Sequence, residues 1–287
     1  MIKGLAITPP VLGRISIGRV VERNDKRIPV KDDQFTITTQ VRGKDGWLAH
    51  PVDEALRSHS ANQKLRSIPV SVLFDQADLN LRADYSLFDR QTGRLMCVGN
   101  GDVCRRHTPE GVKTLDCPSP THCELAQGGL ACKLYGRLHV RVDAREEARV
   151  GEPQQAGDAS QGGQATDTDP SAAASPDPTL SLGDDDIGSF VFRTTGYNSV
   201  RTLAARLQYY QAVSGGKLAS MPLELKLRAK STTMSRGTPI YYADLTVREG
   251  LSLQAAVAQA QSIHQARAAA GFDQNALDQA AQWGYAN

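Results

Sequence analysis

All five cysteines of this 287-residue chain fall within the stretch from Cys97 to Cys132. Spacings of 12, 5 and 8 residues separate four of them, Cys104, Cys117, Cys123 and Cys132. Four thiolates can close a tetrahedral shell around Zn²⁺, and a structural zinc site contributes directly to folding. The clustering therefore predicts a cysteine loop that is held together by one zinc ion.

Two disulfides and one free thiol are the alternative to a metal site. The odd cysteine count, and an N-terminus that lacks the apolar core of a signal peptide, indicate a reducing compartment and so favour zinc. We interpret Cys97 as a small buried residue beside the loop, although Cys97, His107 or His122 could replace one of the four ligands. A site closed by four protein ligands has no open position for a substrate and is structural.

The chain contains no apolar run long enough to cross a bilayer as a helix. We therefore expect a cytoplasmic protein without a membrane partner. The sequence also lacks a serine-nucleophile elbow, an HExxH zinc motif, a Walker loop and paired catalytic carboxylates. An enzyme is the weaker class, and we assign no catalytic residue.

Charge is distributed unevenly along the chain. Residues 1–150 carry 23 Lys and Arg against 18 Asp and Glu, and residues 188–287 carry 10 against 5. Residues 151–187 carry 8 acids and no Lys or Arg. The basic parts are compatible with a polyanionic partner such as DNA and equally with an ordinary mixed surface.

The acidic segment 151–187 is rich in Gly, Ala, Ser, Asp and Pro and contains no aromatic residue. Such a composition buries too little apolar area to offset the entropy of ordering. It predicts a disordered acidic linker, and a tether that competes with nucleic acid for the basic parts is the functional alternative.

The part before this linker is rich in β-strand patterns. Alternating or continuous apolar residues predict strands, and one weaker pattern predicts a helix over 52–65. The predicted strands cover Arg14–Val21, Phe35–Val41, Ile68–Phe74, Leu79–Phe88, Arg94–Val98 and Leu134–Val142.

The part after the linker mixes both types of structure. Strands are predicted at Phe190–Phe192, Leu223–Leu227 and Ile240–Val247, the last two joined by a hairpin loop. A helix is predicted over Ser199–Val213, capped by Asn198 or Ser199, and Ala/Gln-rich helices are predicted over Ser252–Ala270 and Asp273–Trp283. The predicted fold class is α+β, with a mostly antiparallel sheet, a zinc-stabilised cysteine loop, an acidic disordered insert and C-terminal helices.

The segment from Phe192 to Ser199 joins a strand to a helix and is unusually polar. Helix N-termini favour anions, including phosphates, and an aromatic ring can stack on a base. A turn that only caps the helix, with Gly196 supplying an unusual backbone angle, is the alternative. The candidate contacts to nucleic acid or to a partner are Arg193, Thr194, Tyr197, Asn198 and Arg201.

The order of these features resembles a known family. A strand pair around 79–98 runs into Cys-Val-Gly-Asn-Gly-Asp, then come Cys117-Pro, Cys123 and Cys132-Lys, then Gly-Arg-Leu-His-Val. Next come Phe-Arg-Thr-Thr-Gly-Tyr-Asn-Ser-Val and Gly-Gly-Lys-Leu-Ala-Ser-Met-Pro-Leu-Glu-Leu. Over roughly residues 65–250, this pattern resembles the recombination directionality factor-like proteins of phages and integrative elements, whose relatives are often labelled hydrolase or metal-binding.

The resemblance implies a non-enzymatic accessory protein of a mobile element that acts in site-specific recombination. Its implied partners are DNA and a serine integrase or another recombination protein. The alternatives are a single-stranded nucleic-acid-binding protein without an integrase partner, and a metal-dependent hydrolase. The expected organisation is a β-rich part over 1–150, the linker over 151–187, an α+β part over 188–250 that completes the core, and helices over 251–287.

Overall fold

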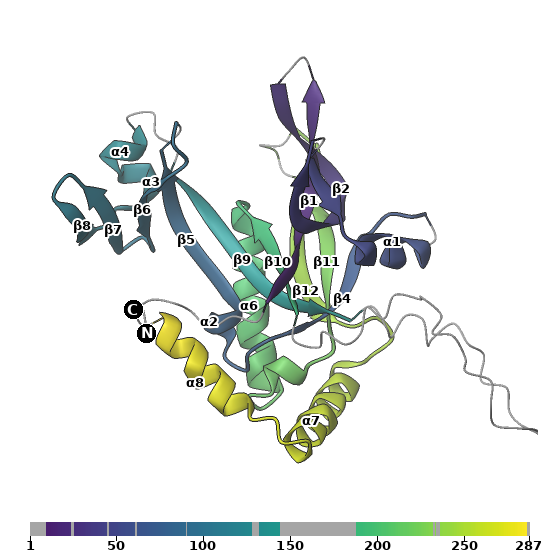
Figure 1. The fold of residues 1–287 in the computed structure, drawn as a ribbon. Helices are drawn as coiled ribbons and strands as arrows, with labels where there is room; N and C mark the ends of the chain where they lie inside the picture. The colour runs from purple at the N-terminus through teal and green to yellow at the C-terminus, as the bar shows by residue number, and fades with distance from the viewer. Residues whose placement is uncertain are drawn as a thin grey trace, which may run out of the picture.

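The computed structural model describes residues 10–23, 26–44, 46–60, 62–89, 91–127, 132–143, 188–231, 233 and 236–285. It confirms an α+β protein with a mostly antiparallel sheet and C-terminal helices (Figure 1). The predicted linker over 151–187 lies outside the described residues. Within the described residues, no helix is long and apolar enough to span a membrane.

A long twisted sheet forms the body of the molecule. Its strands follow the order β3-β2-β1-β10-β9-β5-β6-β7-β8, and β1 with β10 is the parallel pair among antiparallel neighbours. The bounds are Val11–Arg23 for β1, Lys26–Gly43 for β2, Gly46–Ala49 for β3, Leu81–Phe88 for β5, Leu95–Gly99 for β6, Val103–Thr108 for β7, Gly111–Asp116 for β8, Cys132–Val142 for β9 and Ser189–Thr194 for β10.

The sheet branches at β9. One edge of β9 pairs with β10, while the other edge pairs first with β5 and then, at its last residues, with β4. From there β4 pairs with β11, and β11 pairs with β12. These strands are β4 Ser67–Val72, β11 Leu223–Lys230 and β12 Ile240–Val247.

One large core lies between the two branches and α6 (Tyr197–Val213). Ile15, Phe35 and Phe192 contribute to it from the long sheet, and Leu225 and Leu203 contribute from β11 and α6. Since alternate residues of a strand face opposite sides, the residues between these apolar ones are left on the outer face of the long sheet. That outer face carries the charged residues described below.

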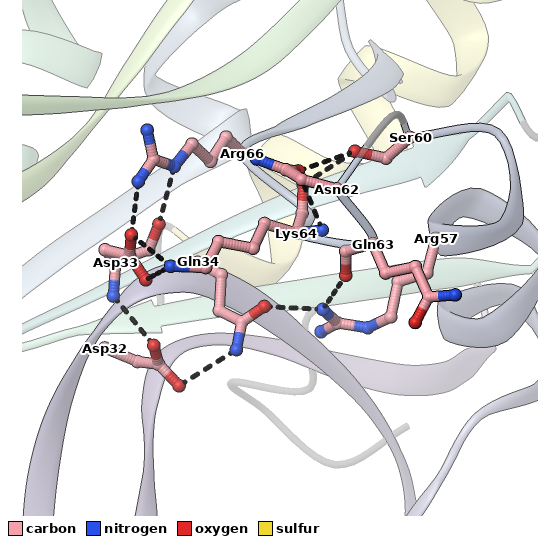
Figure 2. Close-up of polar contacts among 9 residues, drawn as sticks. All are labelled: Asp32, Asp33, Gln34, Arg57, Ser60, Asn62, Gln63, Lys64 and Arg66. Atoms are coloured by element: carbon pink, nitrogen blue, oxygen red, sulfur yellow. Dashed lines mark hydrogen bonds and ion pairs between the residues drawn. The ribbon is translucent and has the colours of Figure 1, made fainter.

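A polar cluster ties β2 to α1 (Pro51–Ser58) and to the segment after it (Figure 2). The Arg57 guanidinium donates to Asp53, to the Gln34 side chain at 2.7 Å and to the backbone carbonyls of Phe35 and Gln63. These acceptors come from β2, from α1 and from the turn beyond α1. Arg57 therefore fixes the position of the helix on the strand.

In Figure 1 the C-terminal helices lie along the bottom of the view, below α2 and α6. They are α7 (Leu253–Ala269) and α8 (Gln274–Tyr285), and the Ser252 side chain caps α7 by accepting from Ala255 N at 3.1 Å. Asp278 of α8 accepts from the backbone N–H groups of Asp75 and Gln76, so a buried carboxylate anchors this helix.

Three sequence predictions need correction. The helix predicted over 52–65 ends at Ser58, because Gln63 adopts a left-handed backbone (φ 54°) and Leu65 O pairs with Phe35 N as an extended segment. The start of the strand predicted at Leu79 is the helical turn α2 (Ala77–Asn80). The cysteine loop contains the hairpin β7–β8 and the short helices α3 (Ser119–His122) and α4 (Glu124–Gln127), none of which was predicted.

Candidate functional site: a cysteine pocket and an arginine-bearing sheet face

Three of the five cysteines project from the same face of the sheet. Leu87 on β5 lies opposite Cys132 on β9 and opposite Cys97 on β6. Directly opposed residues of antiparallel strands point to the same side, so both thiols flank the Leu87 side chain. Cys104 on β7 lies opposite Gly99, two residues along β6 from Cys97, and shares that face.

The other two cysteines arrive from the segment that follows β8. The backbone N–H of Cys117 donates to Asp102 O at 2.8 Å, and Cys123 ends α3 with its N–H bonded to Ser119 O. Gly99 makes room for Cys117, because a Cβ at this position would lie 2.8 Å from Cys117 Sγ and 2.7 Å from Cys104 Cβ. Glycine at 99 is therefore a packing requirement of the pocket.

All five cysteines line one small cavity of about 20 Å³. This volume suits one water-sized occupant or a single ion. Each of the five cysteines is a free thiol in the structure, and none of them forms a disulfide. Within the described residues, no three His, Cys, Asp or Glu side chains already stand in a geometry that would hold a metal ion. The five sulfurs line one cavity, but they would have to move closer together to bind one metal ion.

The electrostatics of the pocket disfavour thiolates without a cation. Burial raises the pKa of Cys104 to about 11, and a hydrogen bond with Cys97 adds to the shift. Burial likewise raises the pKa of Cys132 to about 11, with the neighbouring charges of Cys123, Cys97 and Cys117 contributing. A bound cation would offset both causes, because it stabilises the anionic sulfur that burial penalises.

On the long sheet, three arginines form a row across adjacent strands. Arg82 on β5 lies opposite Arg137 on β9, and Arg137 lies opposite Arg193 on β10. All three side chains are exposed, and we call them the arginine row. Their strand neighbours Leu138 and Phe192 are fully buried in the core. The row therefore lies on the outer face of the sheet.

The positive charge of this face is only partly neutralised. Arg82 pairs with Asp84 at 3.7 Å, whereas no ion pair joins Arg137 or Arg193 to a carboxylate among the described residues. Partial desolvation of its guanidinium against the sheet lowers the pKa of Arg193, and the charges of Arg14 and Arg137 lower it further. Neighbouring cations that lower one another's pKa repel each other, and an anion that binds between them relieves this repulsion.

Burial also lowers the pKa of His139, which lies on β9 two residues from Arg137, and the charges of the arginine row add to the shift. The His139 Nδ1 and the Nε atoms of Arg14 and Arg141 are buried without a hydrogen-bond partner. This part of the outer face therefore holds donors or acceptors that the described residues leave unsatisfied.

Aromatic side chains accompany the arginines. A hollow of about 250 Å³ is lined by Arg82, Arg137, Phe88 and Tyr135, among others, and the two rings meet edge to face with centroids 5.3 Å apart. At the other end of the face, the Arg14 guanidinium lies 3.8 Å from the centre of the Trp47 ring. Guanidinium groups for phosphates and rings for bases are the two components of a nucleic-acid-binding surface.

The polar turn from 193 to 201 differs from the sequence prediction in its capping. The helix begins at Tyr197 with Gly196 as its N-cap, and neither Asn198 nor Ser199 caps it. The Asn198 Oδ1 accepts from Lys230 Nζ at 2.8 Å, while the buried Ser199 hydroxyl accepts from Ala243 N at 3.0 Å. Both side chains are committed to β11 and β12, because the tertiary contacts outcompete the local cap.

The predicted contact residues are divided among different environments. Arg193 belongs to the arginine row, and Thr194 accepts from Gly196 N through its hydroxyl at 3.0 Å. Tyr197 is 63% exposed and Arg201 is exposed on α6. No hydrogen bond, ion pair or ring contact among the described residues joins Arg201 to Arg193.

Sequence reasoning did not find the arginine row. The available signal was an arginine inside two predicted strands, at positions 82 and 137, and an arginine directly after a third predicted strand, at position 193. That signal acquires meaning only when the strand register places the three side by side.

The comparisons with known proteins give one family. A family profile described as "Gp3-like: Recombination directionality factor-like" matches residues 12–150 and 179–248, which is most of the chain. No curated protein and no solved structure matches the sequence. By this match, the chain belongs to the Gp3-like, recombination directionality factor-like family.

Proposed function

We propose that this protein is a non-enzymatic accessory factor of phage site-specific recombination that binds the phosphate backbone of DNA through the arginine row. Membership of the family supports the accessory role in recombination. The observation that carries the DNA contact is the register of Arg82, Arg137 and Arg193 across β5, β9 and β10.

The geometry of the row suits a polyanion better than a single small anion. Adjacent strands lie about 4.8 Å apart, so the three guanidinium groups extend over about 10 Å of flat sheet. Arginine binds phosphate oxygens through several N–H groups held in a fixed plane. Contacts of this kind supply affinity and register without sequence specificity.

The test is DNA affinity as a function of salt concentration. The Arg137→Ala, Arg193→Ala double variant should bind all DNA sequences more weakly, and the slope of log affinity against log salt should fall by about 1.8 for two lost phosphate contacts. Arg236→Ala is the matched control, because it removes an exposed arginine from the β11–β12 turn, outside the row. Equal affinity and slope in the double variant and the control would contradict the proposal.

The same measurement separates the row from the polar turn. A loss of DNA affinity in Arg201→Ala or Tyr197→Ala, with the arginine row intact, would move the contact to the start of α6. Loss confined to Arg137 and Arg193 variants supports the sheet face.

The recombination role is tested with the integrase and attachment sites of the same mobile element. We expect the protein to change the yield or the direction of integrase-catalysed recombination, and to bind the integrase with or without DNA. No effect on recombination in either direction would contradict the accessory role. Turnover of phosphoesters that is abolished by a chelator would instead favour the metal-dependent hydrolase.

A second candidate is a single-stranded nucleic-acid-binding protein. The hollow lined by Phe88 and Tyr135 next to Arg82 and Arg137 is the observation that favours it. Stacking of bases on aromatic rings would make single strands bind better than duplexes. A Tyr135→Ala variant that loses affinity for single strands but not for duplex DNA would support this candidate.

A further inference from the structure

The cysteine pocket offers five thiols where a tetrahedral zinc site needs four. Cys104, Cys117, Cys123 and Cys132 are the set that sequence spacing favours. The strand order gives a way to choose among the five, because three of the cysteines belong to β-strands with a known register.

Cys104 and Cys132 are far apart in the sheet. They belong to β7 and β9, and β5 and β6 lie between those strands. At about 4.8 Å per strand, three steps separate their backbones by about 14 Å. Two sulfurs bound to one zinc ion lie within about 4.6 Å of each other, twice the Zn–S bond length. A cysteine side chain has a single methylene, so these two residues are poorly placed to share one ion.

Cys97 occupies the position between them. It lies on β6, one strand from Cys104 and two strands, about 10 Å of backbone, from Cys132, with Leu87 between Cys97 and Cys132 in the register. Two cysteine side chains that lean toward each other can bring their sulfurs within about 4.6 Å across two strands but not across three. It lines the cavity together with Cys117 and Cys123, which come from outside the sheet.

Cys104 already has a packed environment of its own. It is 2% exposed, and its thiol donates to the carbonyl of Asp116 with a sulfur–oxygen distance of 3.7 Å. It lies opposite Gly99 in the β6–β7 register, and a Cβ on Gly99 would lie 2.7 Å from the Cβ of Cys104. These contacts are those of a small buried core residue.

We propose that the pocket binds one structural Zn²⁺ through Cys97, Cys117, Cys123 and Cys132. Thiolate ligands favour zinc among the common divalent ions, and the small cavity has room for one ion rather than for an iron–sulfur cluster. Binding draws the Cys117–Cys123 segment against the sheet and so fixes α3 and α4, which have no buried residues of their own. In this arrangement Cys104 is the cross-strand neighbour of the site and not one of its ligands.

Arg106 completes the proposed site. It lies opposite Cys97 in the β6–β7 register and lines the same cavity. Four thiolates and one Zn²⁺ carry a net charge of −2, and a guanidinium beside a coordinated sulfur partly compensates that charge. Arg106 would therefore compensate charge at the metal site without being a ligand.

The test is the metal content of full-length protein purified without chelator. Wild type should contain one zinc per chain, and Co²⁺ in its place should give the intense absorption of a tetrahedral four-thiolate site. Cys97→Ser and Cys132→Ser should lose the zinc. Cys104→Ala, His107→Ala and His122→Ala should keep one zinc per chain and the same cobalt spectrum.

Three results would overturn the proposal. They are folded wild type without zinc, a cobalt spectrum with fewer than four thiolates, and loss of zinc from Cys104→Ala while Cys97→Ser retains it. The last result would return the assignment to Cys104, Cys117, Cys123 and Cys132. Should Cys104→Ala fold poorly, Cys104→Val restores the buried volume, and its cobalt spectrum answers the same question. Metal content is independent of DNA affinity, so this proposal and the proposed function can fail separately.

Discussion

At the residue scale, Gly99 shows how one missing side chain controls a site. Its backbone is extended within β6, so the requirement for glycine comes from its neighbours and not from an unusual dihedral angle. The Cys117 sulfur occupies the space that a Cβ would need. The close approach of the segment after β8 to the sheet depends on this space.

We expect Gly99→Ala to displace Cys117 and to lower the free energy of unfolding by about 1–3 kcal/mol, the usual cost of overpacking. Differential scanning calorimetry and the zinc content of the same sample check the two effects. Equal melting temperatures for Gly99→Ala and wild type would show that the pocket is looser than described.

At the element scale, the position of β2 against the segment after α1 rests on charge. Asp33 accepts from Lys64 Nζ at 2.8 Å and pairs with Arg66, and these two hydrogen bonds lower its pKa to about 2 (Figure 2). The network also includes Arg57, which bonds to both sides of the junction. A short helix is thereby held on a strand by polar contacts around its buried residues.

The lowered pKa of Asp33 gives a prediction with a definite sign. The folded state favours the ionised carboxylate, so its stabilising contribution is present above the ordinary pKa of 3.8 and is lost as the pH falls through about 2. Denaturant midpoints of wild type and Asp33→Asn, measured from pH 7 to pH 2, should differ most near neutral pH and converge in acid. A difference that grows toward low pH would contradict the assigned contacts.

At the scale of the whole molecule, the two ends of the sequence build one sheet. β10 lies between β1 and β9, and β4 pairs with β11. The buried core likewise mixes residues from before position 143 with residues from after position 188. Neither part can bury its apolar face without the other.

We therefore expect separately encoded fragments 1–150 and 188–287 to associate when they are produced together. Size-exclusion chromatography should show a single one-to-one complex with the circular dichroism spectrum of the intact protein. Each fragment alone should be poorly folded, because it exposes the core face of its strands. Two fragments that fold independently and elute apart would contradict the shared sheet.

The fold class followed from local patterns, because the periods of apolar residues depend only on neighbours along the chain. The alternating residues of 35–41 and 79–88, and the helical spacing after 199, became elements near the predicted places. The end of α1 could not be predicted from local patterns, because Leu65 pairs with Phe35 instead of continuing the helix. The N-cap of α6 could not be predicted in this way either, because the Ser199 hydroxyl accepts a hydrogen bond from Ala243 on β12 instead of capping the helix.

The sequence by itself determined the family, the concentration of cysteines in one segment and the alternation that produces a sheet with one charged face. Only the tertiary structure decided which charges meet. Arg82, Arg137 and Arg193 are neighbours solely through strand register, and the position of Cys97 between Cys104 and Cys132 is likewise a consequence of strand order. The physical reason is that hydrogen bonds between strands bring together residues that are far apart in the sequence, such as Arg82 and Arg137, which lie 55 positions apart, and no local pattern encodes that pairing.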